Sequence, residues 1–218
     1  MSGEIGEMLK RIELVVSEIA SDGKLPIIIG GEHTLTLGAV RAFKGNVGLV
    51  SLDAHFDLRN EYLGLKTSHA TFMHRVCEEI GPENILIVGV RAACREEIEY
   101  AKNSNLKFIS MENLRRQLLQ DISREIEDFM KSYDKVYLTI DMDVLDPSVA
   151  PAVQNPEPDG LTMNQALNLL EAICRGRVAA LDVVEAAPPY DYGVTSICAA
   201  KMIFEAICQI ERSRRERS

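Results

Sequence analysis

The strongest constraint on the fold is the alternation of short apolar segments with longer amphipathic ones. Six apolar segments have the length of a β-strand: residues 25–29, 47–52, 85–90, 106–109, 136–140 and 178–184. Between and around them, apolar residues recur every three or four positions, which is the period of an amphipathic helix. Strands that alternate with helices form a parallel sheet with helices on both faces. We therefore expect an α/β fold with a mostly parallel sheet.

The helical pattern also predicts where the helices lie. We expect them at residues 4–20, 34–43, 70–80, 95–102, 112–131, 161–174 and 194–210, with a basic, frayed tail over 211–218. Residues 146–160 are rich in proline and glycine and have no regular period, so they are expected to form an ordered surface loop. A chain of 218 residues fits one domain, spanning 1–218.

Composition narrows the class of protein. The formal net charge is −9 and there is no basic patch, which argues against nucleic-acid binding and mildly favours a cationic small substrate. The apolar runs are far shorter than the roughly 20 residues of a membrane span, and the N-terminus lacks the form of a signal peptide. The five scattered cysteines predict reduced thiols, mostly in the core, of a cytoplasmic protein.

A cluster of polar side chains follows the apolar segment 47–52. Asp53, His55 and Asp57 are spaced two residues apart, so in an extended chain they lie on the same side. The carboxyl ends of strands are where open α/β sheets bind their ligands. Carboxylates mixed with imidazole suit Mn, Fe, Co or Zn. The alternative for this segment alone is a solvated polar turn.

A second acidic pair has the same spacing. Asp141 and Asp143 follow the apolar segment 136–140, and matching pairs at two strand ends predict a shared site for two metal ions. The turn Gly30–Gly31 could bring His33 beside these acids, although a capping or core histidine is the alternative.

Two further histidines lie at or near the start of the predicted helix 70–80. His69 precedes this helix, whose N-terminus disfavours imidazolium and so helps the ring to exchange its proton near neutral pH. His74 is expected to be a surface or supporting residue.

Taken together, five segments resemble the ureohydrolase family of arginases and agmatinases from about Leu25 to the C-terminus. They are Gly30-Gly31-Glu32-His33, Asp53-Ala54-His55-Phe56-Asp57, Ser68-His69-Ala70, Asp141-Met142-Asp143-Val144-Leu145-Asp146-Pro147 and Asp182-Val183-Val184-Glu185. The resemblance implies a three-layer α/β/α, arginase-like fold and two Mn²⁺ ions per chain. It also implies a homo-oligomer, because the family commonly forms trimers or hexamers.

The resemblance assigns the metal ligands. His33 and Asp57 would hold one Mn²⁺, and His55 and Asp143 the other. Asp53 and Asp141 would bridge the two ions, with a hydroxide between them as the nucleophile. These residue types suit the chemistry, because two metals lower the pKa of a shared water enough to supply hydroxide near neutral pH.

The resemblance also assigns the substrate-handling residues. Glu185 matches the carboxylate that binds the substrate guanidinium, a planar cation that a carboxylate can accept through two hydrogen bonds. His69 matches a proton-shuttling histidine at the substrate. Asp143 would pass a proton to the leaving amine, and His69 would exchange protons with solvent.

The substrate is expected to be a small cationic guanidino compound. The segment 57–69 is similar to the agmatinase branch, which predicts hydrolysis of agmatine to putrescine and urea. The alternatives are a guanidinobutyrase, an arginase, a formiminoglutamase, or a shortened and inactive metal-binding relative. The sequence differs from the family pattern at two places, and both differences bear on these alternatives. Only residues 1–29 precede the Gly30–Gly31 turn, so the sheet is expected to lack an N-terminal edge, and residues 150–155 replace two glycines of the family pattern.

Overall fold

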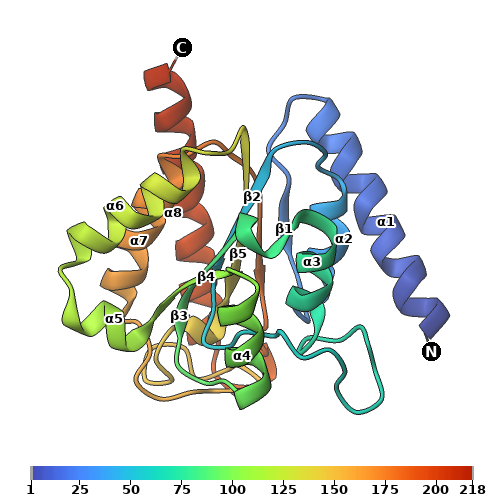
Figure 1. The fold of residues 1–218 in the computed structure, drawn as a ribbon. Coiled ribbons are helices and arrows are strands. Elements are labelled where there is room, and N and C mark those ends of the chain that lie inside the picture. Colours follow the sequence, from blue (N-terminus) through green and yellow to red (C-terminus); the bar gives the residue numbers. More distant parts are fainter. Residues whose placement is uncertain (1, 218) are drawn as a thin grey trace.

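The centre of the protein is a six-stranded sheet. The computed structural model describes residues 2–217, and within them every pair of neighbouring strands in this sheet is parallel. The strand order is β1-β6-β5-β2-β3-β4. Figure 1 shows the sheet between α1, α2 and α3 on one side and α6, α7 and α8 on the other. The strands are β1 (Ile27–Ile29), β2 (Val47–Leu52), β3 (Ile85–Val90), β4 (Lys107–Ser110), β5 (Lys135–Asp141) and β6 (Val178–Val184). The predicted α/β/α fold is confirmed, and β1 forms one edge of the sheet.

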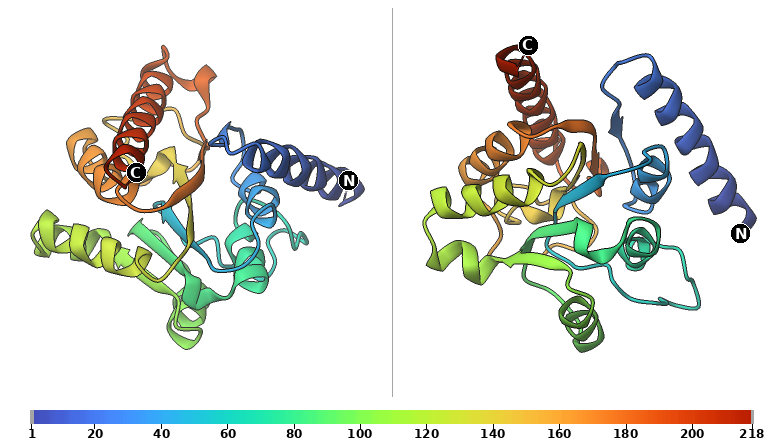
Figure 2. Two further views of the ribbon diagram at one scale, coloured as in Figure 1. Left: turned by 90° about the horizontal axis from the view of Figure 1, so that it is seen from above. Right: turned by 45° about the horizontal axis from the view of Figure 1, so that its top comes forward.

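Helices cover both faces of this sheet, and Figure 2 shows the two groups on opposite sides. One group is α1 (Ser2–Ser21), α2 (Leu35–Arg41), α3 (Phe72–Ile80) and α4 (Arg95–Asn103); the other is α5 (Met111–Arg116), α6 (Leu119–Met130), α7 (Met163–Cys174) and α8 (Val194–Arg217). Short 3₁₀ turns lie at Pro82–Asn84, Met142–Val144 and Pro188–Tyr190. Because strand side chains alternate, Leu49 joins the core on one face and Val50 the core on the other.

The predicted single helix over 112–131 is wrong. Gln117 and Leu118 have extended backbone angles, which divide the segment into α5 and α6. The two helices pack on different elements, since α5 contacts the ends of β3 and β4 whereas α6 contacts α7. No glycine or proline marks this break, so packing rather than local sequence decides it.

The predicted frayed tail is also wrong as far as residue 217, while residue 218 lies outside the described residues. Helix α8 continues to Arg217, whose guanidinium donates hydrogen bonds to the carbonyls of Arg175 and Gly176. Ser213 donates a further hydrogen bond to the carbonyl of Arg175. These hydrogen bonds pair carbonyls at the C-terminus of α7 that have no partner within the helix. The Arg217 guanidinium is also attracted by the negative end of the α7 dipole, so these contacts hold the last turns of α8 in place.

The structure agrees with the prediction of reduced cysteines that lie mostly in the core. All five thiols are free, but only Cys77 and Cys174 are buried. Cys198 is partly buried and packs against the core, so three of the five cysteines contact the core as expected, whereas Cys94 lies at the start of α4 and Cys208 is exposed on α8. None of the helices within residues 2–217 combines the length and apolar character needed to cross a membrane.

Candidate functional site

The two acidic pairs meet because their strands are neighbours. β2 and β5 pair in parallel with Leu52 opposite Ile140, so Asp53 and Asp141 follow at matching positions. The Oδ1 atom of Asp53 accepts a hydrogen bond of 2.7 Å from the His55 amide, and Oδ1 of Asp141 accepts one of 2.8 Å from the Asp143 amide. The same local turn therefore occurs at the ends of β2 and β5. In each turn the Oδ2 atom remains directed toward Nδ1 of His33.

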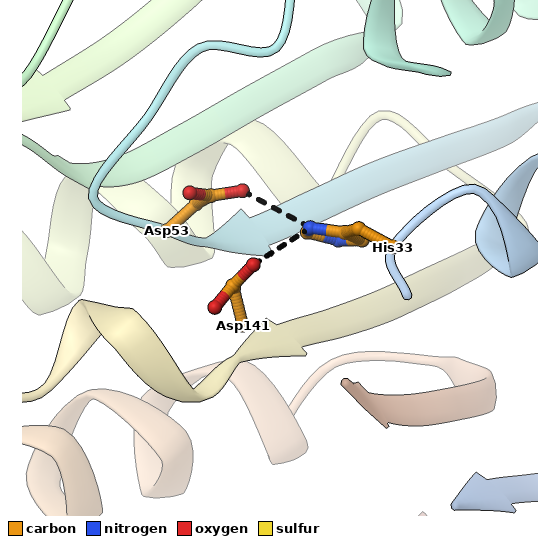
Figure 3. Close-up of side chains that lie close together, drawn as sticks. All are labelled: His33, Asp53 and Asp141. Carbon is orange, nitrogen blue, oxygen red and sulfur yellow. Dashed lines mark hydrogen bonds and ion pairs between the residues drawn. The ribbon is translucent and has the colours of Figure 1, made fainter. Parts of the chain in front are cut away.

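Both carboxylates point toward the same ring nitrogen of His33, as Figure 3 shows. His33 follows β1 in the turn that contains Gly30 and Gly31, and its ring is fully buried. The Nδ1 atom is 3.0 Å from Oδ2 of Asp141, 3.4 Å from Oδ2 of Asp53 and 3.8 Å from Oδ2 of Asp57. An imidazole nitrogen surrounded by three carboxylate oxygens is an arrangement suited to a divalent cation.

A second ligand group lies beside the first and shares Asp53 with it. The Nδ1 atom of His55 is 2.9 Å from Oδ2 of Asp143 and 3.8 Å from Oδ1 of Asp53. Oδ1 of Asp143 accepts a hydrogen bond from the Ala54 amide, which fixes the carboxylate. In each of the two groups, one possible ligand atom per residue lies within 4.8 Å of the others. The structure thus brings together the six residues that the sequence predicted as metal ligands.

The electrostatics of these residues fit a cation site. Burial and mutual repulsion raise the pKa of Asp53, Asp57 and Asp141 well above the ordinary value. Oδ2 of Asp53 is buried and has no hydrogen-bond partner among the described residues. Burial lowers the pKa of His33 to about 3, which keeps the ring neutral, as a metal ligand must be. A bound cation would supply the partner that Oδ2 of Asp53 lacks.

The acid beside His55 behaves differently. Burial is the largest single effect on the pKa of Asp143 and would raise it, but the hydrogen bond and charge of His55, with hydrogen bonds from Asp141 and the Ala54 amide, together lower it. For His55, burial would lower the pKa, but the Asp143 carboxylate raises it to about 9. The two side chains therefore form an ion pair in the metal-free protein, and a metal ion would replace the proton on Nδ1.

A buried hydrogen-bond network supports His33 from behind. Its Nε2 atom lies 2.8 Å from Oγ1 of Thr139, which in turn donates a 2.5 Å hydrogen bond to Oδ1 of Asp182. Thr36 and Tyr137 donate to Oδ2 of the same carboxylate. Because the Thr139 proton goes to Asp182, Nε2 of His33 must be the donor, which leaves the Nδ1 lone pair free for a metal.

Sequence reasoning assigned no role to Thr139 or Asp182. The available signal was the presence of two polar residues within strand segments that are otherwise apolar. Burial raises the pKa of Asp182 to about 6, but the hydroxyl donors around it still allow it to be ionised at neutral pH.

A pocket of about 560 Å³ opens beside the ligand groups. His69 and Glu185 both line it. The His69 amide donates a 2.6 Å hydrogen bond to Glu32, and its Nδ1 lies 3.5 Å from the same carboxylate, which raises the pKa of His69. Oε1 of Glu185 accepts a 2.7 Å hydrogen bond from the His33 amide, and burial raises the pKa of Glu185. Both side chains are thus held at the pocket wall next to the ligands.

The fold and the site define an α/β protein with candidate ligands for two metal ions at the carboxyl ends of a parallel sheet. The sequence matches the model of the Arginase family over residues 1–208, and the chain belongs to this family.

Known relatives agree with this assignment. An agmatinase of Halalkalibacterium halodurans is 36% identical over 91% of this chain and 68% of that protein. A guanidinobutyrase of Pseudomonas aeruginosa is 33% identical over 93% of this chain and 66% of that protein. The crystal structure of the agmatine ureohydrolase of Thermoplasma volcanium superposes with a TM-score of 0.90 at 37% identity, covering 97% of this chain and 71% of that one.

Proposed function

We propose that the protein is a manganese-dependent hydrolase that converts agmatine to putrescine and urea. The observation that carries this proposal is the pair of ligand groups sharing Asp53, next to a pocket lined by His69 and Glu185. Membership of the arginase family supports a hydrolase of this kind, and the agmatinase relatives support agmatine as the substrate.

Two Mn²⁺ ions per chain are proposed as the cofactor. His33 and Asp57 would hold one ion, His55 and Asp143 the other, and Asp53 and Asp141 would contact both. When bound, two divalent cations supply hydroxide at neutral pH by lowering the pKa of water. The mixture of carboxylate and imidazole donors suits manganese.

The protein side chains bind the substrate and move protons. One oxygen of Glu185 is held by the His33 amide, so the other can accept hydrogen bonds from the substrate guanidinium. Asp143, fixed by the Ala54 amide and His55, would deliver a proton to the leaving amine. His69, with a side chain 34% exposed, would exchange protons with solvent while Glu32 holds its orientation.

The charges of the pocket favour a substrate that ends in an amine. Glu157 lines the pocket, and its carboxylate lies 3.9 Å from Nε2 of His55. Among residues 2–217, no lysine or arginine forms an ion pair with this carboxylate. His55 is thus its charged neighbour, and because the Glu157 side chain is 40% exposed, it can also bind the distal ammonium group of agmatine.

A second candidate is an ω-guanidino acid such as guanidinobutyrate. Arg59 also lines the pocket and could bind a distal carboxylate, and a guanidinobutyrase is among the relatives. However, the Arg59 guanidinium already lies 5.1 Å from the ring centre of Tyr62, and its Nε is 4.0 Å from the buried carboxylate of Glu97. Arg59 has these two contacts, whereas the Glu157 carboxylate has one such contact within residues 2–217, to His55. Together with the agmatinase relatives, this makes agmatine the first choice.

The proposal is tested by measuring urea release from agmatine, guanidinobutyrate and arginine with added Mn²⁺. For formiminoglutamate, the assay measures formamide release. Agmatine should give the highest kcat/KM. Glu157→Gln should lower kcat/KM for agmatine about fivefold, as expected for an ion pair worth about 1 kcal/mol, and should not lower it for guanidinobutyrate. Higher activity on guanidinobutyrate in the unaltered protein would contradict the choice of agmatine. Metal binding without turnover of any of these compounds would indicate an inactive relative.

We further propose that the protein is cytoplasmic and forms homo-oligomers. Free thiols and an acidic composition support the location. Ile197 and Phe204 of α8 are 69% and 62% exposed, which supports self-association. Light scattering after size exclusion should give a mass that is a multiple of the chain mass, and a monomer would contradict this.

A further inference from the structure

Glu97 is a buried carboxylate that has no place in the chemistry described so far. It is the third residue of α4, yet it is only 5% exposed. Its Oε2 atom accepts a 2.9 Å hydrogen bond from the Cys94 amide, which closes a capping box at the start of the helix. Its Oε1 atom accepts a second hydrogen bond, of 3.1 Å, from the amide of Leu58. One carboxylate therefore connects the start of α4 to the loop that carries Asp57.

The Leu58 amide matters because Asp57 has an unusual backbone conformation. Its φ angle is 52°, in the left-handed region that residues with a side chain rarely adopt. Such conformations persist where surrounding contacts hold them, and they are common at functional sites. The Leu58 N–H belongs to the peptide unit that follows Asp57, so its hydrogen bond restricts rotation about the Asp57 backbone.

Helix α3 also holds this loop, through hydrogen bonds from His74 to the carbonyls of Asp57 and Leu58. The carbonyl of Asp57 accepts a hydrogen bond from the His74 amide, and the carbonyl of Leu58 bonds to Nδ1 of His74. These contacts come from α3, whereas the contact to the Leu58 amide comes from α4. His74 thus has the supporting role that was one of the sequence expectations, and Glu97 completes the support.

We propose that Glu97 is a positioning residue that sets the Asp57 carboxylate for metal binding. The inference rests on the metal site proposed above. Asp57 is the ligand whose Oδ2 lies 3.8 Å from Nδ1 of His33, so a change in its backbone rotation would move this oxygen away from the site. Because both oxygens of Glu97 accept backbone hydrogen bonds, Glu97 is not free to act as a substrate ligand, although it lines the pocket.

A simpler explanation is that Glu97 only caps α4, and the protein contains a matched control for that role. Gln165 is the third residue of α7, and it forms the same reciprocal capping box with Thr162. It does not line the pocket beside the ligand groups. Gln165→Ala therefore removes an equivalent cap without touching the loop of Asp57.

The test is Mn²⁺ titration by calorimetry of the unaltered chain, Glu97→Gln, Glu97→Asp and Gln165→Ala. A glutamine can accept only one of the two backbone hydrogen bonds, and an aspartate is too short to reach both amides. We expect both Glu97 variants to lower the affinity for one of the two Mn²⁺ ions 10- to 100-fold. This is the typical effect of changing a residue that orients a metal ligand. Gln165→Ala should bind both ions like the unaltered chain. Circular dichroism before titration identifies any variant that fails to fold.

A double-mutant cycle adds a result that a purely structural role would not produce. If Glu97 acts through Asp57, Glu97→Gln should cause no further loss of Mn²⁺ affinity in an Asp57→Ala background. Unchanged affinity in the folded Glu97 variants would overturn the inference, and so would an equal loss in Gln165→Ala. An unaltered chain that binds no Mn²⁺ would instead overturn the proposed metal site, so the two failures are distinguishable.

Discussion

The sharpest test of the site concerns the hydrogen bond behind His33. Thr139→Val replaces a hydroxyl by a methyl group of nearly the same volume, so it should leave no cavity. The residue is fully buried, and its hydroxyl connects Nε2 of His33 to the carboxylate of Asp182. The substitution therefore isolates the loss of two hydrogen bonds from any loss of packing.

The structure sets the size of the effect. The His33 N–H would be left buried and unpaired, which costs about 1–3 kcal/mol. The hydrogen bond to the Asp182 carboxylate contributes about 1.5–3 kcal/mol, although Thr36 and Tyr137 still donate to that group. Because the remaining donors can partly compensate, we expect the free energy of unfolding of the metal-free protein to fall by about 3 kcal/mol. For a chain of this size, that corresponds to a decrease in Tm of about 9 °C.

Metal binding should weaken as well. Without an acceptor at Nε2, the His33 ring loses the contact that selects its tautomer and its orientation, so Mn²⁺ affinity should drop 10- to 100-fold. Urea unfolding of the metal-free protein measures the first effect, and calorimetric titration with Mn²⁺ measures the second. Thr139→Ser is the control, because it keeps the hydroxyl and should bind Mn²⁺ like the unaltered protein. Normal Mn²⁺ affinity in Thr139→Val, or equally weak binding in Thr139→Ser, would refute this reasoning.

Two further predictions follow from the charged groups of the site. In the metal-free protein, burial raises the pKa of Asp53, Asp57 and Asp141, so they retain protons that a metal ion must displace. Mn²⁺ binding should therefore release protons and strengthen as the pH rises; calorimetry in buffers of different ionisation enthalpy measures this, and binding independent of pH would contradict it. His69→Ala should leave Mn²⁺ affinity unchanged but lower kcat about 10²- to 10⁴-fold, as expected for the loss of a proton-transfer group. Steady-state urea release measures this effect, and an unchanged kcat would exclude the proton-shuttle role.

The sequence alone was sufficient to predict the order and type of most elements, because hydrophobic periodicity is a local property. It was also sufficient to place Asp53 and Asp141 together. Two acids that follow parallel strands emerge at the same edge of a sheet, and the register of β2 and β5 confirms that these strands are neighbours. Expectations about helix ends were less reliable, since the break at Gln117 and the ordered last turns of α8 depend on contacts with other elements.

Only the tertiary structure decided how the ligands are held. Thr139 and Asp182 come from different strands, and Glu97 of α4 contacts Leu58, which lies in the loop between β2 and α3. The carboxylate of Glu157 is placed at the pocket by a loop without regular periodicity. Spacing along the chain does not encode such contacts, because they form only when separate elements pack. The chemical types of the candidate ligands were thus visible in the sequence, whereas their orientation and support follow from packing.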